Sequence, residues 1–106
     1  MIGLALVSAM AMASLQTAAA DSSRKAFVTC LHDVVEKAKA DKVTADGFGA
    51  FADAQCGAAA NSFKSAMVSF DVKNKVPRKS AEADAQSAID DYLATAADRY
   101  KASLPQ

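Results

Sequence analysis

The two cysteines of this chain, Cys30 and Cys56, constrain its fold more than any other feature. Cys30 lies thirteen residues before Val43 and Cys56 lies thirteen residues after it, and both border stripes of apolar residues at helical spacing. If two helices form a hairpin that turns near Val43, the cysteines stand at the same height. A disulfide needs Cα atoms about 4.4–6.8 Å apart, and the small residues 57–60 would let two helices approach that closely. The spacing therefore predicts a structural disulfide between Cys30 and Cys56.

Two other interpretations of the cysteines remain open in the sequence, namely a pair of buried free thiols and a catalytic thiol. The chain contains neither C-x-x-C nor C-x-x-C-H, so redox catalysis and haem attachment have no local support. Disulfides form mainly in exported proteins, whose compartments are oxidising. Evidence for export would therefore favour the disulfide.

The first twenty residues, MIGLALVSAMAMASLQTAAA, have the pattern of a secretory signal peptide. Residues 2–13 are apolar, and Ala18 to Ala20 form an A-x-A cleavage pattern that predicts cutting between Ala20 and Asp21. No Lys or Arg stands near Met1, so the usual positive n-region is missing. The alternative is an uncleaved membrane anchor, for which the apolar run is short. We expect residues 1–20 to be a signal peptide and residues 21–106 to form one helical domain, periplasmic or secreted, with no stable membrane insertion after cleavage.

Apolar spacing predicts the first two helices. The first covers residues 23–40, with Ser22 or Ser23 as its cap. Thr44 is expected to cap the second helix, with Val43 and Phe48 at the spacing of a hydrophobic staple. The first stripe consists of Phe27, Leu31, Val34 and Ala38, and the second of Phe48, Ala52, Cys56, Ala59, Phe63, Ala66 and Phe70. A break or kink near Gly57 is possible in the second helix.

A third helix is expected after Ser80, its predicted cap, because Pro77 disfavours continuation of the second helix and Asn74 suits a left-handed end position. Its apolar stripe consists of Ala81, Ala85, Ala88 or Ile89, Tyr92, Ala96 and Tyr100. No strand pattern or internal repeat is present. The sequence predicts an all-α fold, a small antiparallel three-helix bundle whose first two helices form a disulfide-linked hairpin.

Few residues suggest chemistry. His32 is the only histidine, and Glu36 and Asp33 are the carboxylates near it. A zinc site needs three or four ligands, so these residues are too few for one. We therefore expect His32 to be an exposed histidine opposite the apolar stripe. Asp90 and Asp91 are adjacent and point in different directions on a helix, which favours a solvated face over a paired-carboxylate site. Tyr92 and Tyr100 are expected to edge the core. We predict no catalytic, cofactor-binding or metal-binding residues.

The formal net charge is zero, so no general attraction to nucleic acid or anionic lipid follows. The charges are uneven, however. Residues 61–79 are basic and residues 80–106 are acidic; the basic stretch holds Lys64, Lys73, Lys75, Arg78 and Lys79 against Asp71. We favour docking of the basic connector near the acidic last helix over a stripe that binds a partner.

The sequence does not select a molecular function. It lacks the nucleophile, metal and phosphate-loop motifs of common enzyme classes. The leading hypothesis is that this is a small exported, non-enzymatic protein with a binding or stress-related role. Its expected partner is another protein, whose identity the sequence does not give. The alternative is a specific inhibitor or immunity-type protein of another exported protein. No nucleic acid is expected as a partner.

Overall fold

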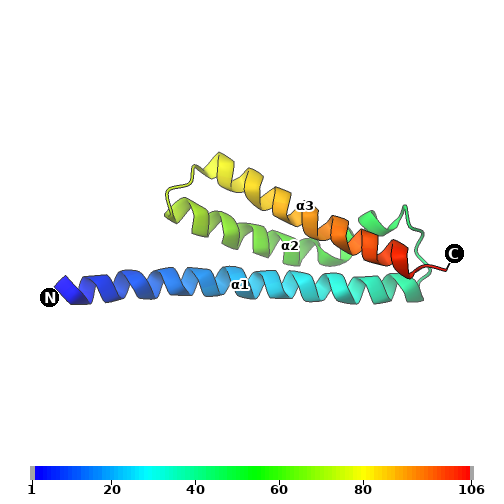
Figure 1. Ribbon diagram of the computed structural model, residues 1–106, viewed down its shortest axis with the longest axis horizontal. Coiled ribbons are helices and arrows are strands. Elements are labelled where there is room, and N and C mark those ends of the chain that lie inside the picture. The colour runs from blue at the N-terminus through cyan, green and yellow to red at the C-terminus, as the bar shows by residue number, and fades with distance from the viewer. Residues whose placement is uncertain (1, 106) are drawn as a thin grey trace.

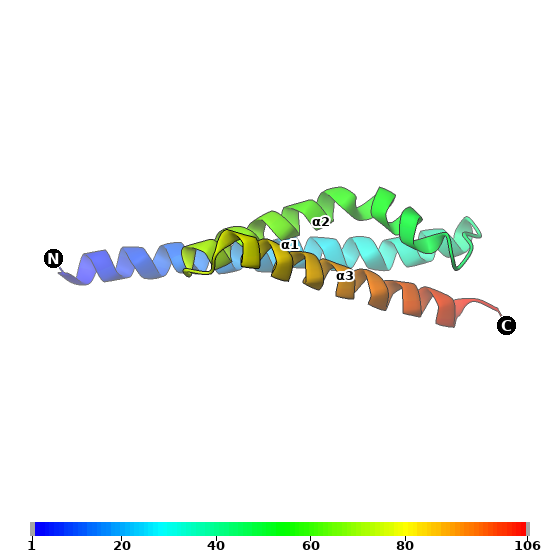
Figure 2. The ribbon, with the colours of Figure 1, turned by 90° about the horizontal axis from the view of Figure 1, so that it is seen from above.

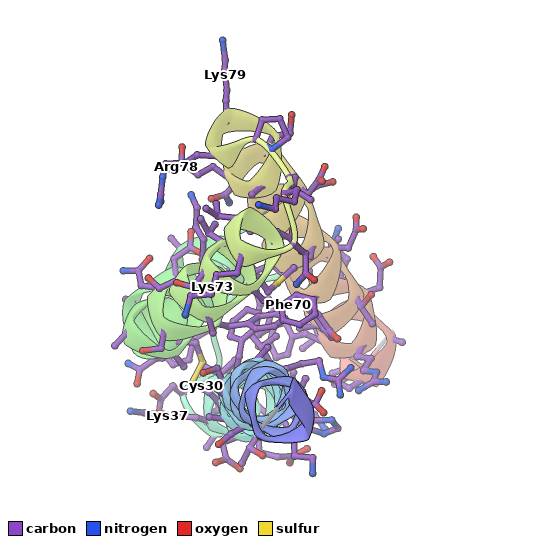
Figure 3. The ribbon with its side chains drawn as sticks, turned by 90° about the vertical axis from the view of Figure 1, so that its left-hand side faces the viewer. Cys30, Lys37, Phe70, Lys73, Arg78 and Lys79 are labelled. Atoms are coloured by element: carbon purple, nitrogen blue, oxygen red, sulfur yellow. A yellow bond between two sulfur atoms is a disulfide. The ribbon has the colours of Figure 1, made fainter. Side chains whose placement is uncertain are left out.

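The computed structural model describes the backbone of residues 2–105 and the side chains of residues 18–105. Within that range the chain forms three helices and no strand: α1 (Ile2–Ala40), α2 (Phe48–Lys73) and α3 (Arg78–Ser103). Consecutive helices run antiparallel, and α2 and α3 lie side by side along the second half of α1 (Figure 1). Seen end-on, the three helices form a triangle around a shared core (Figure 3). The all-α three-helix prediction is confirmed.

Helix α1 is longer than the sequence pattern indicated. It begins at Ile2 and not near Ser23, and it runs without a break through Ala20 and Asp21. The reason is local: residues 4–20 contain neither glycine nor proline and are rich in alanine, leucine and methionine, which favour helix. Ser22 and Ser23 are therefore interior residues and not caps. The predicted boundary at Ala20 is not marked by a change in backbone structure, and cleavage there stays a prediction.

Helix α1 ends in a Schellman motif at the connection to α2. In this motif a residue with left-handed backbone angles lets the N–H groups after the helix donate to its last carbonyls. Lys42 has φ 56°, and the N–H of Val43 donates to the carbonyl of Ala38 at 3.0 Å. The prediction that Thr44 caps the second helix is wrong: Gly47 takes the cap position without a side-chain hydrogen bond, and Thr44 Oγ1 accepts the N–H of Gly47 at 3.0 Å in the turn before the helix. Helix α2 itself begins later, at Phe48, after one tight turn.

The end of α2 repeats this geometry with Lys75. Lys75 is the left-handed residue, with φ 72°, and the N–H of Val76 donates to the carbonyl of Asp71 at 3.0 Å. The prediction that Asn74 takes this position is wrong: Asn74 has φ −93° and its Nδ2 donates to the carbonyl of Phe70 at 2.8 Å. The shift by one residue places Val76 where its side chain packs against the apolar cluster between α2 and α3.

Helix α3 begins directly after Pro77, and Ser80 is not its cap. Pro77 has φ −56° and ψ 138°, and its carbonyl accepts the N–H of Ala81 at 2.9 Å. Proline has no N–H to lose and has a fixed φ, so it suits the position just before a helix. No side chain caps this end of α3.

The core is one main cluster and one smaller cluster. The predicted stripes supply the main cluster, whose buried members are Phe27, Leu31, Val34, Ala38, Phe48, Ala52, Cys56, Phe63, Ile89, Ala96 and Tyr100. The smaller cluster lies near the α2–α3 turn and consists of Val68, Ala81 and Ala85. Here the stripe prediction for α2 is only partly right, because Val68 is buried while Phe70 is half-buried. Helix α2 is continuous past Gly57 and has no break there, and it bows over α1 (Figure 2).

Three aromatic rings fill the middle of the bundle, one from each helix. Phe27 lies 6.1 Å from Phe63 and 5.9 Å from Tyr92, and Phe63 lies 6.0 Å from Tyr92, all measured between ring centroids. Tyr92 meets both phenylalanines edge-on, the arrangement that the charge distribution of aromatic rings favours. The three rings fix how the helices are spaced around the centre.

Candidate functional site

Cys30 and Cys56 form the predicted disulfide. Their Cα atoms are 5.8 Å apart. The bond links α2 to the part of α1 that packs in the bundle. Cys56 is buried in the main core and Cys30 is half-buried beside it. The close approach does not depend on Gly57, because a Cβ added there would meet nothing within 4 Å. Both thiols of the chain are consumed by the bond, so neither is a nucleophile in this state.

His32 is exposed, as expected, but it does not lie opposite the apolar stripe. Its Nε2 lies 3.4 Å from Nη1 of Arg99 on α3. Val28 and Val35, which flank His32 at helical spacing, are half-buried, so this side of α1 faces α3. The sequence showed only one stripe on α1, whereas the third helix covers a second side of it.

The other polar residues singled out in the sequence are not brought together. Asp90 accepts a hydrogen bond from Nε2 of Gln86 at 2.9 Å, and Asp91 is exposed on a different side of α3. Tyr92 edges the core, as predicted, whereas Tyr100 is fully buried within it.

The charged side chains of residues 18–105 lie outside the core; none of them is buried. The two ion pairs found there, Arg24–Asp21 at 2.9 Å and Lys39–Glu36 at 3.1 Å, are both local to α1. No ion pair joins the basic stretch 61–79 to α3 in the described part of the chain. The one polar contact is from Lys64 Nζ to Oε1 of Gln86, at 3.0 Å. Among the described residues, no group of three potential metal-ligating side chains is clustered.

The main hollow on the surface is a groove between α1 and α3, with a volume of about 440 Å³. Small-molecule and anchor-residue sites commonly occupy about 300–1,000 Å³. The α1–α3 groove is lined by Val28, Leu31, His32, Val35, Glu36, Lys39, Tyr92, Thr95, Ala96 and Arg99. On α1 the lining runs from residue 28 to residue 39, which corresponds to about 16 Å of helix. The groove is therefore elongated along the helices.

The floor and the rim of the groove differ in character. Leu31 and Ala96 form buried parts of the floor, while the exposed rim carries His32, Glu36, Lys39, Thr95 and Arg99. Glu36 is paired with Lys39, which leaves Arg99 as a cation without a carboxylate partner in the described range. One N–H of its guanidinium faces His32, and the others remain for a ligand. The rim therefore has a positive balance above an apolar floor.

Two smaller hollows, each of about 300 Å³, lie elsewhere on the bundle. One lies between α2 and α3 beside the Lys64–Gln86–Asp90 hydrogen bonds. The other lies on the α1–α2 side next to Cys30 and Lys37, whose Nζ donates to Oε1 of Gln55 at 3.3 Å. The α1–α3 groove has a larger volume than either of them, about 440 Å³, and is the candidate site.

Sequence analysis missed this groove, although a signal for it exists. Val28, His32, Val35 and Lys39 follow one another in steps of four, three and four, which is a second helical face beside the core stripe. That face mixes apolar and basic residues, as the wall of a partly covered groove does. The pattern alone does not predict a groove, because the groove forms only where α3 packs beside this face of α1.

Comparison with known proteins adds no further assignment: no protein-family model matches the chain, and no curated protein and no solved structure is similar to it. In the part of the chain that the structure describes, no helix is both long and apolar enough to cross a membrane.

Proposed function

We propose that this chain is an exported, non-enzymatic binding protein and that the α1–α3 groove holds an apolar segment of a partner protein bearing an acidic group. The single observation that carries the proposal is the composition of the groove, an apolar floor under a rim in which Arg99 lacks a carboxylate partner. Helix-in-groove recognition uses such surfaces, with apolar anchors in the groove and charges at its edge.

Export is supported by two independent features. The leader with its A-x-A pattern before Asp21 predicts a signal peptide, and the Cys30–Cys56 disulfide is compatible with an oxidising compartment. Together they favour a periplasmic or secreted protein that begins at Asp21 after cleavage. Sequencing the N-terminus of the exported protein tests this part, and a start at any residue before Ala18 would contradict it.

A binding role is favoured over catalysis by the polar groups of the groove. A serine, threonine or cysteine nucleophile needs a base within hydrogen-bond reach. The lining holds two hydroxyls, those of Tyr92 and Thr95, and one imidazole, that of His32, and no hydrogen bond joins either hydroxyl to His32 in the described structure. His32 instead faces the cationic Arg99. These groups are suited to orienting a bound anion.

The second candidate, a specific inhibitor or immunity-type protein, uses the same groove on a single exported partner. It is favoured by the charged rim, where Glu36 pairs with Lys39 and His32 lies against Arg99, because charges at the edge of a groove select among partners. A general stress chaperone would instead use an adaptable apolar surface, commonly rich in methionine. Met67 is the only methionine after Asp21 and does not line the groove. A chaperone role should appear as suppression of client aggregation at neutral or low pH.

A defined probe tests the groove directly. The dye 8-anilinonaphthalene-1-sulfonate combines apolar rings with an anion, the chemistry that the groove is proposed to accept. We expect Arg99→Glu and Val35→Asp each to weaken binding of the dye to the folded protein by at least about fivefold, equivalent to roughly 1 kcal/mol. Lys37→Glu is the matched control, since Lys37 is an exposed cation on α1 that lies outside the groove.

The same variants connect the groove to a biological partner. A partner retained from periplasmic extract should be lost with Arg99→Glu, kept with Lys37→Glu and sensitive to salt. Equal retention by both variants, or dye binding that Arg99→Glu leaves unchanged, contradicts the proposal. Near-UV circular dichroism of each variant verifies that the core is packed, because a loosened core also binds this dye while keeping its helices.

A further inference from the structure

Four cations gather at one end of the bundle, around the turn that joins α2 to α3. Lys73, Lys75, Arg78 and Lys79, which we name the basic tip, are all exposed. Figure 3 looks onto this end and shows Arg78 and Lys79 pointing away from the helices, with Lys73 at the near end of α2. None of the four forms an ion pair within residues 18–105. Their charge is therefore available to a partner.

The position of two of these cations works against helix stability. Arg78 and Lys79 occupy the first turn of α3, which has no acidic residue and no side-chain cap. The N-terminus of a helix carries partial positive charge, so cations are unfavourable there. Lys73 is better placed, at the C-terminus of α2. Because the fold gains nothing from Arg78 and Lys79 at this end, a role in binding explains them better than a role in folding.

Apolar side chains lie directly beside the cations. Val72 and Val76 are half-buried and pack against the small cluster between α2 and α3, and Phe70 is half-buried on the preceding turn. Pro77 is exposed between Val76 and Arg78. A surface that combines cations with partly exposed apolar groups suits the boundary between lipid headgroups and acyl chains.

The N-terminal part of α1 emerges at the same end. In Figures 1 and 2, α1 runs alongside the α2–α3 turn and continues beyond it toward its N-terminus. This continuation carries the apolar residues 2–13 of the predicted leader. A leader enters a membrane during export, so this end of the bundle is the one closest to the bilayer until the leader is cleaved.

We propose that the basic tip docks on the anionic headgroups of a lipid bilayer. Each Lys or Arg near an anionic surface strengthens adsorption by about fivefold. The zero net charge of the chain does not oppose this, because residues 71–79 hold four cations against one carboxylate, Asp71, a local balance of +3. The next carboxylates, Glu82 and Asp84 on α3, follow about one helical turn or more after Arg78. The protein then attaches end-on, which leaves the α1–α3 groove open along the side of the bundle.

Vesicle sedimentation of the full chain tests the proposal. The probe is a set of vesicles of phosphatidylcholine alone and of phosphatidylcholine with about one third phosphatidylglycerol, an anionic lipid. Because every variant carries the same leader, the change in preference for anionic over neutral vesicles between variants measures the contribution of the replaced cations. We expect that replacing all four tip cations by glutamine lowers this preference at least about tenfold. Salt at about 1 M, where screening acts within about 3 Å, should abolish it in the unchanged protein.

The matched control replaces four other exposed cations by glutamine, namely Lys25, Lys37, Lys42 and Lys101. It removes the same charge from elsewhere on the molecule, and we expect it to keep most of the anionic preference. An equal loss in both variants, or no anionic preference in the unchanged protein, overturns the proposal. Loss of a protein partner with the tip variant, at unchanged vesicle binding, would overturn it in favour of a protein-binding tip. Circular dichroism and the intact disulfide verify folding of both variants.

Discussion

The hydroxyl of Tyr100 lies against the backbone carbonyl of Ala38, 3.2 Å away, and also contacts the carbonyl of Val43. The ring of Tyr100 is fully buried and stacks on Phe48 with the centroids 4.7 Å apart. The last turns of α3 are thereby joined to the end of α1 and the start of α2. One side chain thus closes the end of the bundle opposite the basic tip.

We expect Tyr100→Phe to lower the free energy of unfolding by about 0.5–1.5 kcal/mol, because it keeps the ring but leaves the part-buried carbonyl of Val43 without its donor. Urea denaturation at an unchanged slope measures the loss. Tyr92→Phe is the control: no hydrogen bond of its hydroxyl is found in the described part of the chain, so its effect should be small. Equal losses in the two variants would mean that the Tyr100 hydrogen bond contributes nothing specific.

The disulfide should supply a large share of the stability. It closes a loop with a sequence separation of 26 residues, for which the chain-entropy model gives about 3.5 kcal/mol. Domains of this size have about 5–15 kcal/mol in total. Replacing Cys30 and Cys56 together by serine should therefore lower the melting temperature by more than about ten degrees. A reductant should do nearly the same to the unchanged protein and nothing further to the double variant; alkylation of both thiols without reductant would refute the bond.

Two lysines occupy left-handed backbone positions that glycine adopts without cost. We expect Lys42→Gly to raise the free energy of unfolding by up to about 1 kcal/mol, because it removes the clash of the lysine Cβ with the neighbouring carbonyl at φ 56°. The gain is reduced by the larger freedom of glycine in the unfolded chain. Lys42→Ala keeps the Cβ and should bring no gain. A stabilising alanine variant would show that the lysine side chain, and not its backbone, carries the cost.

The sequence predicted those features that local patterns and covalent limits determine. Three apolar stripes located the helices, and the symmetric placement of Cys30 and Cys56 around Val43 paired the first two. Helix ends were predicted less well, since Pro77 rather than Ser80 precedes α3 and Lys75 rather than Asn74 takes the left-handed position. These outcomes depend on which residue must point its side chain into the core, as Val76 does. Capping preferences do not contain that information.

The α1–α3 groove and the orientation of His32 could not be predicted for a related reason. A stripe on α1 defines the direction of the core but not the angle at which a third helix packs beside it. That angle depends on the fit of large rings such as Phe27, Phe63 and Tyr92, which is a property of the assembled core. The same angle decides which polar residues beside the core, such as His32 on α1 and Arg99 on α3, line the α1–α3 groove and which face open solvent.

Two glycines, Gly57 within α2 and Gly47 just before it, provide the last prediction. Gly57 lies within the helix, and a methyl group added there would meet no atom within 4 Å. Gly57→Ala should therefore raise the free energy of unfolding by about 0.5–1 kcal/mol, since alanine is the better helix former. At Gly47 the added Cβ would lie 2.9 Å from Thr44 Oγ1, which accepts the Gly47 N–H. Gly47→Ala should bring no gain or a loss, because it displaces that hydroxyl and disturbs the turn before α2. Urea denaturation of both variants decides the point: a destabilising Gly57→Ala would show that the closeness of α1 and α2 at the disulfide does require a glycine.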